Sequence, residues 1–239
     1  MAIASSGGVK GDGRVQWSDV LKLDPIYLNL GGCYDCHPQK GYRGYVSLDL
    51  KPRRRWAVAH DLTKPMPVPD GVVSRIHSED FIEHIRPEQI EKLFVECHRV
   101  LKPGAFMRVG CPDYAGPRQR HCLELGYDPD WPLHITMTTH DLLEDIIERS
   151  PFGRHKFYQY WDGDRYVEEP IDYSLGLITR TPDNCSICRR AGWWQNWRGR
   201  VADEKYRRSK NGNVTELEML TRRGHRLHLT SIVFDLFRE

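Results

Sequence analysis

The chain has 239 residues, the size of one domain with an appendage, and it can bury a core without disulfide or metal support. Lys and Arg number 35 and Asp and Glu 33, and this formal charge of +2 argues against a nucleic-acid partner. The sequence has no apolar run approaching the about 18 residues of a membrane span. Residues 1–16, without the apolar centre of a secretory signal, are expected to be a disordered arm, and the protein to be cytoplasmic and off the membrane.

The first half of the chain consists of short β-prone runs and one clear helix. Runs bounded by Gly, Pro or Asp predict strands at residues 26–30, 45–50, 56–60, 72–76 and 105–110. Apolar residues from Ile90 onward recur at helical spacing, which predicts a helix over residues 87–101. Pro103-Gly104 ends this helix, because that dipeptide favours a turn.

The second half has one more helix and several strands. Thr138-Thr139 are candidate caps for a helix that ends near residue 149. Strands are predicted at residues 157–161, 217–220 and 228–237. Strands that alternate with helices indicate a parallel sheet with crossover helices, and the last strands indicate an antiparallel edge. The fold class is therefore predicted to be α/β.

A nucleotide site is indicated where two of these strands end. Gly31-Gly32 follows the first strand, and Asp49 lies near the end of the second. Glycines let a ligand approach the backbone closely, and a carboxylate accepts hydrogen bonds from ribose hydroxyls. A Gly-Gly turn after a strand is by itself more often only a turn, so the order of the neighbouring motifs has to decide.

That order extends over five segments: LNLGG, YVSLDL, AHDLTKPMPVPDG, VVSRIHSEDFIEHI and CHRVLKPGAFMRVGCPDY. The series resembles the class I S-adenosylmethionine (SAM)-dependent methyltransferases, specifically a bacterial branch of the methyltransferase type 11 group. The resemblance is strong over residues 27–114 and weaker beyond them. It implies a Rossmann-like fold whose sheet is mostly parallel and seven-stranded with an antiparallel edge hairpin. The methyltransferase domain would span residues 17–239, with a loop-rich insertion on the substrate side around 162–213.

The resemblance also implies a cofactor site and a reaction. Gly31 and Gly32 would lie under the methionine and ribose of SAM, and Asp49 would hold the ribose hydroxyls. The other implied contacts are with the adenine, from Leu50, Asp61 and Leu62, and with the methionine end, from Ser78 and Glu79. The reaction would move a methyl group to a small-molecule acceptor and leave S-adenosylhomocysteine.

His84 is the first candidate for a catalytic base, because the motif series places it where the acceptor would enter. The alternative is a histidine that only shapes the pocket wall. Methyl transfer depends mainly on alignment, and a base is needed only for a hydroxyl or amine acceptor that carries its proton. His134 and His140 are weaker candidates, for which surface or capping roles are the alternative.

One departure from the family pattern keeps a second hypothesis open. The usual glycine turn is richer in glycine and leads into a full helix, whereas here Pro38 disfavours an early helix. The first crossover helix is therefore predicted to be short or missing. The alternative function is a catalytically degenerate methyltransferase-like module that binds or scaffolds.

The cysteines raise the question of zinc. The chain has seven, an odd number and too few for a disulfide framework, so reduced thiols are expected. Two CxxC pairs, Cys33 with Cys36 and Cys185 with Cys188, have the ligand count of a structural zinc site, and His37 is a possible substitute ligand. Because a long stretch of chain separates the pairs, unrelated thiols are the alternative, and zinc is not favoured.

Overall fold

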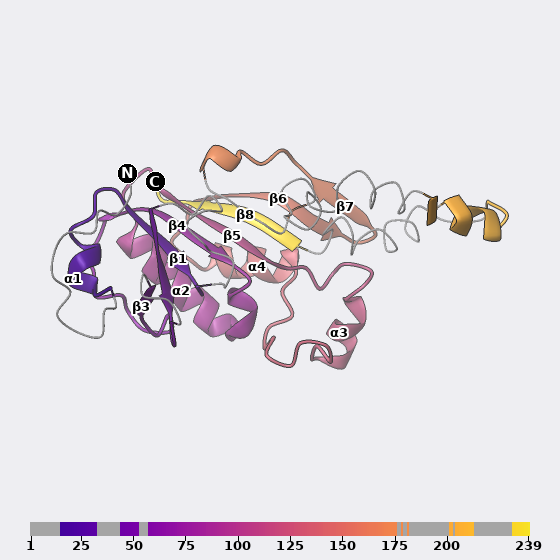
Figure 1. Cartoon of the computed structure of the whole chain (residues 1–239), viewed down its shortest axis with the longest axis horizontal. Coiled ribbons are helices and arrows are strands. Elements are labelled where there is room, and N and C mark those ends of the chain that lie inside the picture. Colours follow the sequence, from indigo (N-terminus) through magenta and orange to yellow (C-terminus); the bar gives the residue numbers. More distant parts are fainter. Residues whose placement is uncertain are drawn as a thin grey trace.

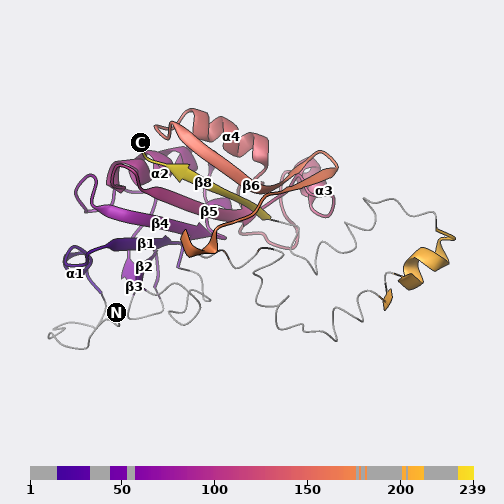
Figure 2. The same cartoon turned by 90° about the horizontal axis from the view of Figure 1, so that it is seen from above.

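The computed structural model describes residues 15–32, 44–52, 57–175, 178, 181, 201–202, 204–212 and 231–239. In these residues, eight strands form one sheet in the order β3-β2-β1-β4-β5-β8-β6-β7. Figure 2 shows β1, β4, β5, β8 and β6 side by side across this sheet. The mixed α/β fold is as predicted, but the sheet has one strand more than the seven expected.

Five strands form the parallel part of the sheet, and each overlaps a strand predicted from the sequence. They are β1 (Ile26–Leu30), β2 (Tyr45–Asp49), β3 (Ala57–Ala59), β4 (Val73–Glu79) and β5 (Phe106–Pro112). All seven residues of β5 are buried, which is typical of a parallel strand covered on both faces. Since parallel strands point the same way, the carboxyl ends of all five lie along one edge.

Both predicted long helices are present. Helix α2 (Pro87–Val100) begins with a proline at its first turn, and α4 (His140–Glu148) is capped by Thr139, whose Oγ accepts from the Leu142 amide. The two helices lie together on one face of the sheet (Figure 1), where Arg149 forms an ion pair with Glu91. Their apolar faces belong to the main core.

Two further helices, α1 and α3, are short. Helix α1 (Trp17–Val20) precedes the first strand. Helix α3 (Arg120–Leu125) was not predicted, because it has one buried residue, Cys122, and so lacks an apolar stripe. It ends at Gly126 in the left-handed conformation.

The remaining strands are antiparallel. Strand β8 (Ser231–Phe237) lies between β5 and β6 (Arg154–Asp162), and β7 (Arg165–Glu168) forms a hairpin with β6 at the edge. Strand β7 is the extra strand: its four half-buried or exposed residues have too weak a pattern to be predicted. The strand predicted at residues 217–220 lies outside the described residues.

A buried ion pair joins the parallel and antiparallel parts. Arg108 on β5 lies opposite Asp235 on β8, and its Nε and Nη2 each donate to a carboxylate oxygen at 2.8 Å. Both side chains are 1% exposed. Tyr158 on β6 also donates to Asp235, at 2.9 Å, and Arg108 donates to the carbonyl of Asp172. The pair therefore specifies the register of β8, because a slip of one residue would bury both charges without partners.

We expect Asp235→Ala to destabilise the fold by about 3–5 kcal/mol, since it leaves the Arg108 guanidinium buried without its carboxylate. Urea unfolding monitored by circular dichroism measures the change. The control is the double variant Arg108→Met with Asp235→Leu, which removes both charges and should lose much less. Equal losses for the two variants would contradict the assignment of the effect to an unpaired charge.

Candidate active site

The turn after β1 is built for close approach of backbone. Gly31 has φ of +72°, and a Cβ atom placed on it would lie 2.5 Å from Cβ of Phe81, in the segment after β4. The amides of Gly31 and Gly32 donate to the carbonyl of Leu48 at 3.0 and 3.1 Å. The turn is thus held between the ends of β2 and β4, and only glycine fits at Gly31.

The structure brings Asp49 to this turn. A Cβ atom on Gly32 would lie 3.5 Å from Cβ and 3.6 Å from Oδ2 of Asp49. The Oδ1 atom of Asp49 accepts from the amide of Lys51 at 2.7 Å, which orients the carboxylate. A glycine surface and an oriented carboxylate therefore meet at the carboxyl edge of the sheet, where open α/β sheets bind ligands.

Asp61 and the two leucines have different local environments. The Oδ1 atom of Asp61 accepts from both the amide and the hydroxyl of Thr63, and these hydrogen bonds lower the pKa of Asp61. Oδ1 of Asp61 thus stabilises the turn from Asp61 to Thr63. The other carboxylate oxygen, Oδ2, lies 3.5 Å from Lys64 Nζ. Leu62 is buried and Leu50 is 65% exposed.

The end of β4 carries Ser78 and Glu79, both buried. The hydroxyl oxygen of Ser78 has no hydrogen-bond partner among the described residues, although it is shielded from water. Asp80 follows with φ of +52°, an unfavourable conformation for a residue other than glycine, and its amide donates to Gly110 at 2.9 Å. Such strain is concentrated at functional sites, and here it turns the chain toward the next group of side chains.

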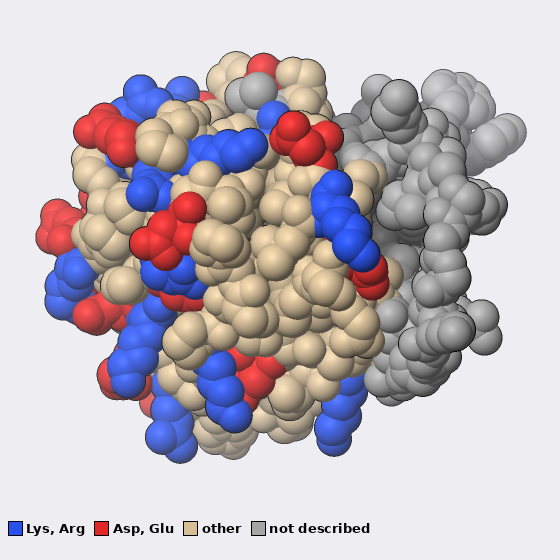
Figure 3. All heavy atoms as spheres, turned by 90° about the vertical axis from the view of Figure 1, so that its left-hand side faces the viewer, with Lys and Arg blue, Asp and Glu red and all other residues tan. Residues whose placement is uncertain are grey.

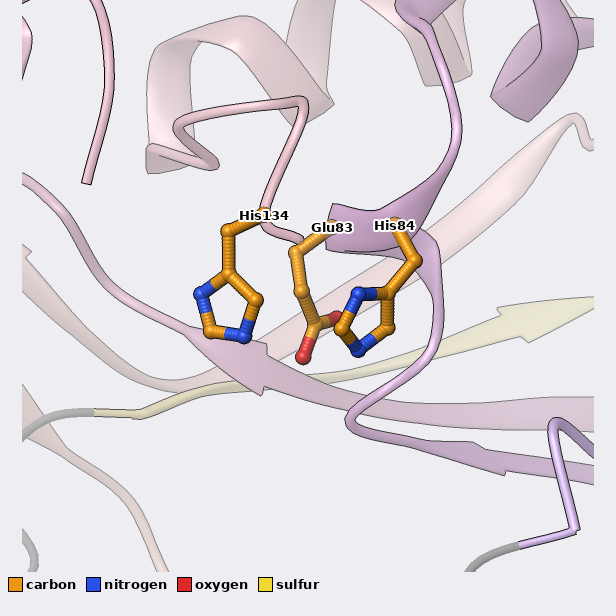
Figure 4. Close-up of side chains that lie close together, drawn as sticks. All are labelled: Glu83, His84 and His134. Carbon is orange, nitrogen blue, oxygen red and sulfur yellow. The ribbon is translucent and has the colours of Figure 1, made fainter. Parts of the chain in front are cut away.

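Glu83, His84 and His134 form a cluster at the same edge (Figure 4). Glu83 and His84 lie on a 3-10 turn, η2 (Ile82–His84), and Glu83 is fully buried. One ligand atom from each of the three residues lies within 4.8 Å of the others. The carbonyl of Glu83 accepts from the amides of Ile135 and Thr136 at 2.8 and 3.0 Å. These bonds hold the loop that carries His134 against η2.

Tyr114 and Asp128 support His134 from behind. The Tyr114 hydroxyl donates to Asp128 Oδ2 at 2.7 Å and lies 2.5 Å from Nδ1 of His134. Burial, together with the Asp128 carboxylate, raises the pKa of Tyr114, so the phenol keeps its proton. The hydrogen bonds from Tyr114 and from two backbone amides outweigh burial and lower the pKa of Asp128.

Asp113 anchors the turn that carries Tyr114. It is fully buried and accepts from the amide of Trp161 at 2.7 Å and from that of Ala115 at 3.0 Å. Burial raises the pKa of Asp113 from its usual 3.8 to about 6, against the effect of these two amides. Because Trp161 is on β6, this contact ties the turn after β5 to the antiparallel part of the sheet.

The predicted site residues divide into three groups. The structure brings Gly32 to Asp49, and it brings His84 to Glu83 and to His134, which was rated below His84. His140 lies apart from the cluster, with its ring stacked on Tyr160 at 4.1 Å. The candidate zinc ligands lie outside the described residues: Cys33, Cys36, His37, Cys185 and Cys188.

Two supporting residues were missed from the sequence. Neither Tyr114 nor Asp128 is among the candidate site residues that the sequence predicts. A tyrosine two positions beyond a parallel strand lies at the carboxyl edge, which is the one signal that could have pointed to it. Asp128 has no such signal, since its role comes from a contact across the loop.

Comparison with known proteins agrees with this geometry. Residues 38–109 match the family model described as a methyltransferase domain. The structure aligns with a SAM-dependent methyltransferase from Archaeoglobus fulgidus with a TM-score of 0.51 and 15% identity, over 89% of this chain and 85% of that one. The chain has a class I methyltransferase fold. The predicted resemblance and fold class are therefore confirmed, apart from the strand count.

Two further methyltransferase structures are more distant. A SAM-dependent methyltransferase from Thermotoga maritima aligns with a TM-score of 0.48 and 14% identity, over 62% of this chain and 74% of that one. Geranyl diphosphate C-methyltransferase from Streptomyces coelicolor aligns with a TM-score of 0.47 and 12% identity, over 90% and 74%. The curated proteins include no match to this sequence. Among the described residues of this methyltransferase fold, no helix has the length and apolarity to cross a membrane.

We expect Gly31→Ala to destabilise the fold more than Gly104→Ala, by about 1–3 kcal/mol, because the added methyl group meets Phe81. Gly104 is a matched control, since it has φ of +78° and open space around its Cβ position. Both variants carry the same backbone strain, so urea unfolding isolates the steric effect. Equal losses would show that the turn is not tightly held against Phe81.

We expect Asp113 to make stability fall as pH rises from about 4 to 6, since the folded state holds this proton more tightly than the unfolded state. Each pKa unit corresponds to about 1.4 kcal/mol, so the fall amounts to about 3 kcal/mol. Urea unfolding as a function of pH measures it. Asp113→Asn has no proton to lose, and its stability should lack this slope; parallel curves for the two proteins would contradict the prediction.

Proposed function

We propose that this chain is a SAM-dependent methyltransferase that transfers a methyl group to a small-molecule acceptor, and that residues 17–239 form the methyltransferase domain. The observation that carries the proposal is the contact of the Gly31-Gly32 turn with Asp49 at the carboxyl edge of a methyltransferase fold. This combination offers a surface without side chains beside a carboxylate, as a nucleoside with a ribose diol requires.

The described residues fit the cofactor. Oδ1 of Asp49 is engaged by Lys51, which leaves Oδ2, on the side of Gly32, for the ribose hydroxyls. Leu50 presents exposed apolar surface for the adenine, whose amino group would donate to Asp61. The other proposed contacts are Leu62 beside the adenine and Ser78 and Glu79 at the methionine end.

Ser78 gives this assignment a physical reason. A buried hydroxyl without a hydrogen-bond partner among the described residues loses its interactions with water and gains none in return. A polar group of the bound cofactor would supply that interaction. When bound, SAM supplies an electrophilic methyl group on a sulfonium, so the chain's main task is to align the acceptor with it.

His84 is the residue that we place at the acceptor. Its Nδ1 lies 2.9 Å from the carbonyl oxygen of Leu133, which can only accept, so Nδ1 carries the proton of the neutral ring. The lone pair is then on Nε2, where it can take a proton from a hydroxyl or amine as the acceptor atom bonds to the methyl group. The side chains of Trp131, Leu133 and Ile135, close to His134 in the sequence, are exposed. They would contact an apolar part of the acceptor.

The surface is consistent with a small-molecule acceptor. On the face shown in Figure 3, Lys and Arg side chains are interspersed with Asp and Glu. This mixture is typical of a solvated surface, whereas a nucleic-acid site is a basic patch or stripe. The expectation that no nucleic acid is a partner remains a prediction.

Calorimetric titration of SAM and S-adenosylhomocysteine into the purified protein tests the proposal. We expect the wild type to bind both, and Asp49→Ala to bind about 10- to 100-fold more weakly, because it lacks charge-assisted hydrogen bonds to the ribose. Asp145→Ala, which removes an exposed carboxylate on α4, is the control and should bind like the wild type.

Each negative result has a distinct meaning. If the wild type binds neither nucleoside, the methyltransferase reading fails and the binding or scaffold module takes its place. If Asp49→Ala binds as tightly as the wild type, the ribose lies elsewhere and the residue assignment is wrong.

A further inference from the structure

The cluster of Glu83, His84 and His134 has a property that methyl transfer alone does not require. Three side chains from two separate segments direct one nitrogen or oxygen atom each toward a common point (Figure 4), within 4.8 Å of one another. The protonation of the two imidazoles decides whether these atoms are hydrogen-bond donors or electron-pair donors. The atoms behind each ring determine that protonation.

His84 presents an electron pair to the cluster. As described above, the carbonyl of Leu133 requires a proton on Nδ1 of this ring. In the neutral imidazole, Nε2 is therefore unprotonated, and it is the atom available to the cluster. Backbone carbonyls that hold the far nitrogen of a histidine in this way are typical second partners of metal ligands.

His134 presents an electron pair for a related reason. Its Nδ1 contacts the Tyr114 hydroxyl, and that hydroxyl donates its single proton to Asp128. The Tyr114 oxygen must therefore accept from Nδ1 of His134, which leaves Nε2 unprotonated in the neutral ring. The chain from Asp128 through Tyr114 to His134 is a longer form of the carboxylate–histidine arrangement that orients metal ligands.

Glu83 adds a negative charge at the same point. Its side chain is fully buried, and one of its carboxylate oxygens lies within 4.8 Å of a nitrogen of each imidazole. A carboxylate oxygen and two imidazole electron pairs that meet in this way are all ligands for a cation.

We propose that Glu83, His84 and His134 bind one divalent transition-metal ion. Two imidazole nitrogens and one carboxylate oxygen are the ligand set of catalytic zinc and non-haem iron sites, which keep open positions for water or substrate. Mg²⁺ and Ca²⁺ prefer oxygen ligands, so the two nitrogens select first-row transition metals, with Zn²⁺ bound more tightly than Mn²⁺. Its ligands are other residues than the four CxxC cysteines.

The position of the site suggests what the ion does, a role that rests on the proposed methyl transfer. The η2 turn follows Phe81, whose Cβ lies against the Gly31 turn, so the ion would lie beside the cofactor's proposed methionine end. An acceptor hydroxyl bound at an open position loses its proton to solvent more readily. Its oxygen would then bond to the methyl group as the bond from sulfur to methyl breaks. With the ion bound, Nε2 of His84 would be a ligand, and the ion would replace His84 as the group that activates the acceptor.

Metal titration of the full chain, after treatment with a chelator, tests the site. We expect calorimetry to show one Zn²⁺ per chain at this site, and Co²⁺ to give a visible spectrum without the charge-transfer band of thiolate ligands. His134→Ala should weaken Zn²⁺ binding at least 100-fold. Tyr114→Phe keeps all three ligands but removes the hydroxyl that contacts His134 and Asp128, and it should weaken Zn²⁺ binding about 10- to 100-fold.

Two controls separate this site from other sources of binding. His140→Ala removes a histidine that lies outside the cluster, and it should bind Zn²⁺ like the wild type. A variant with serine at all four CxxC positions should also keep this Zn²⁺. Thermal unfolding without metal identifies any variant that fails to fold. If His134→Ala does not fold, Tyr114→Phe still tests the site, because it leaves all three ligands in place.

The proposal is overturned if the wild type binds no stoichiometric transition metal. It is also overturned if His134→Ala retains binding while the variant without the CxxC cysteines loses it. Titration of S-adenosylhomocysteine is a separate readout. Zn²⁺ binding without nucleoside binding would support the metal site and reject methyl transfer. Nucleoside binding without Zn²⁺ binding would support the cofactor site and reject the metal site.

Discussion

The buried pair of Arg108 and Asp235 is the contact on which the arrangement of the sheet depends. It specifies how β8 lies against β5, and β8 in turn positions β6. The amide of Trp161 on β6 then reaches Asp113, which holds the turn after β5. That turn carries Tyr114 to His134. A charge pair deep in the sheet thus determines the geometry of a cluster at its carboxyl edge, although neither residue lies there.

A second constraint comes from the parallel strands. Because they share one direction, the segments after β1, β2, β4 and β5 are all brought to one edge. At that edge Gly31 and Asp80 both have positive φ angles. Glycine adopts a positive φ without strain, whereas this conformation costs free energy at Asp80. The chain then passes close to the Gly31 turn before it enters η2. The cofactor site and the metal site that we propose are therefore neighbours for a topological reason.

In the function that we propose, the loop that carries His134 is the part of the site that would contact the acceptor. It is held by backbone hydrogen bonds to the Glu83 carbonyl and by the contact between Tyr114 and Asp128. Its apolar side chains Trp131, Leu133 and Ile135 remain exposed. An acceptor with an oxygen for the metal and an apolar body would use both features, and changes in this loop would alter the choice of acceptor without disturbing the cofactor turn.

The sequence by itself determined the elements whose signals are local. The five parallel strands and the helices α2 and α4 follow from hydrophobic periodicity and turn residues. The resemblance to methyltransferases rests on the order of the five motifs. Strand β7, which the sequence did not predict, and helix α3 were missed, because neither has a buried face long enough to produce a periodic pattern. Only the tertiary structure decided that His134 joins Glu83 and His84, and which nitrogen of each imidazole carries the proton. Those properties depend on hydrogen bonds between residues far apart in the chain, and no local pattern encodes them.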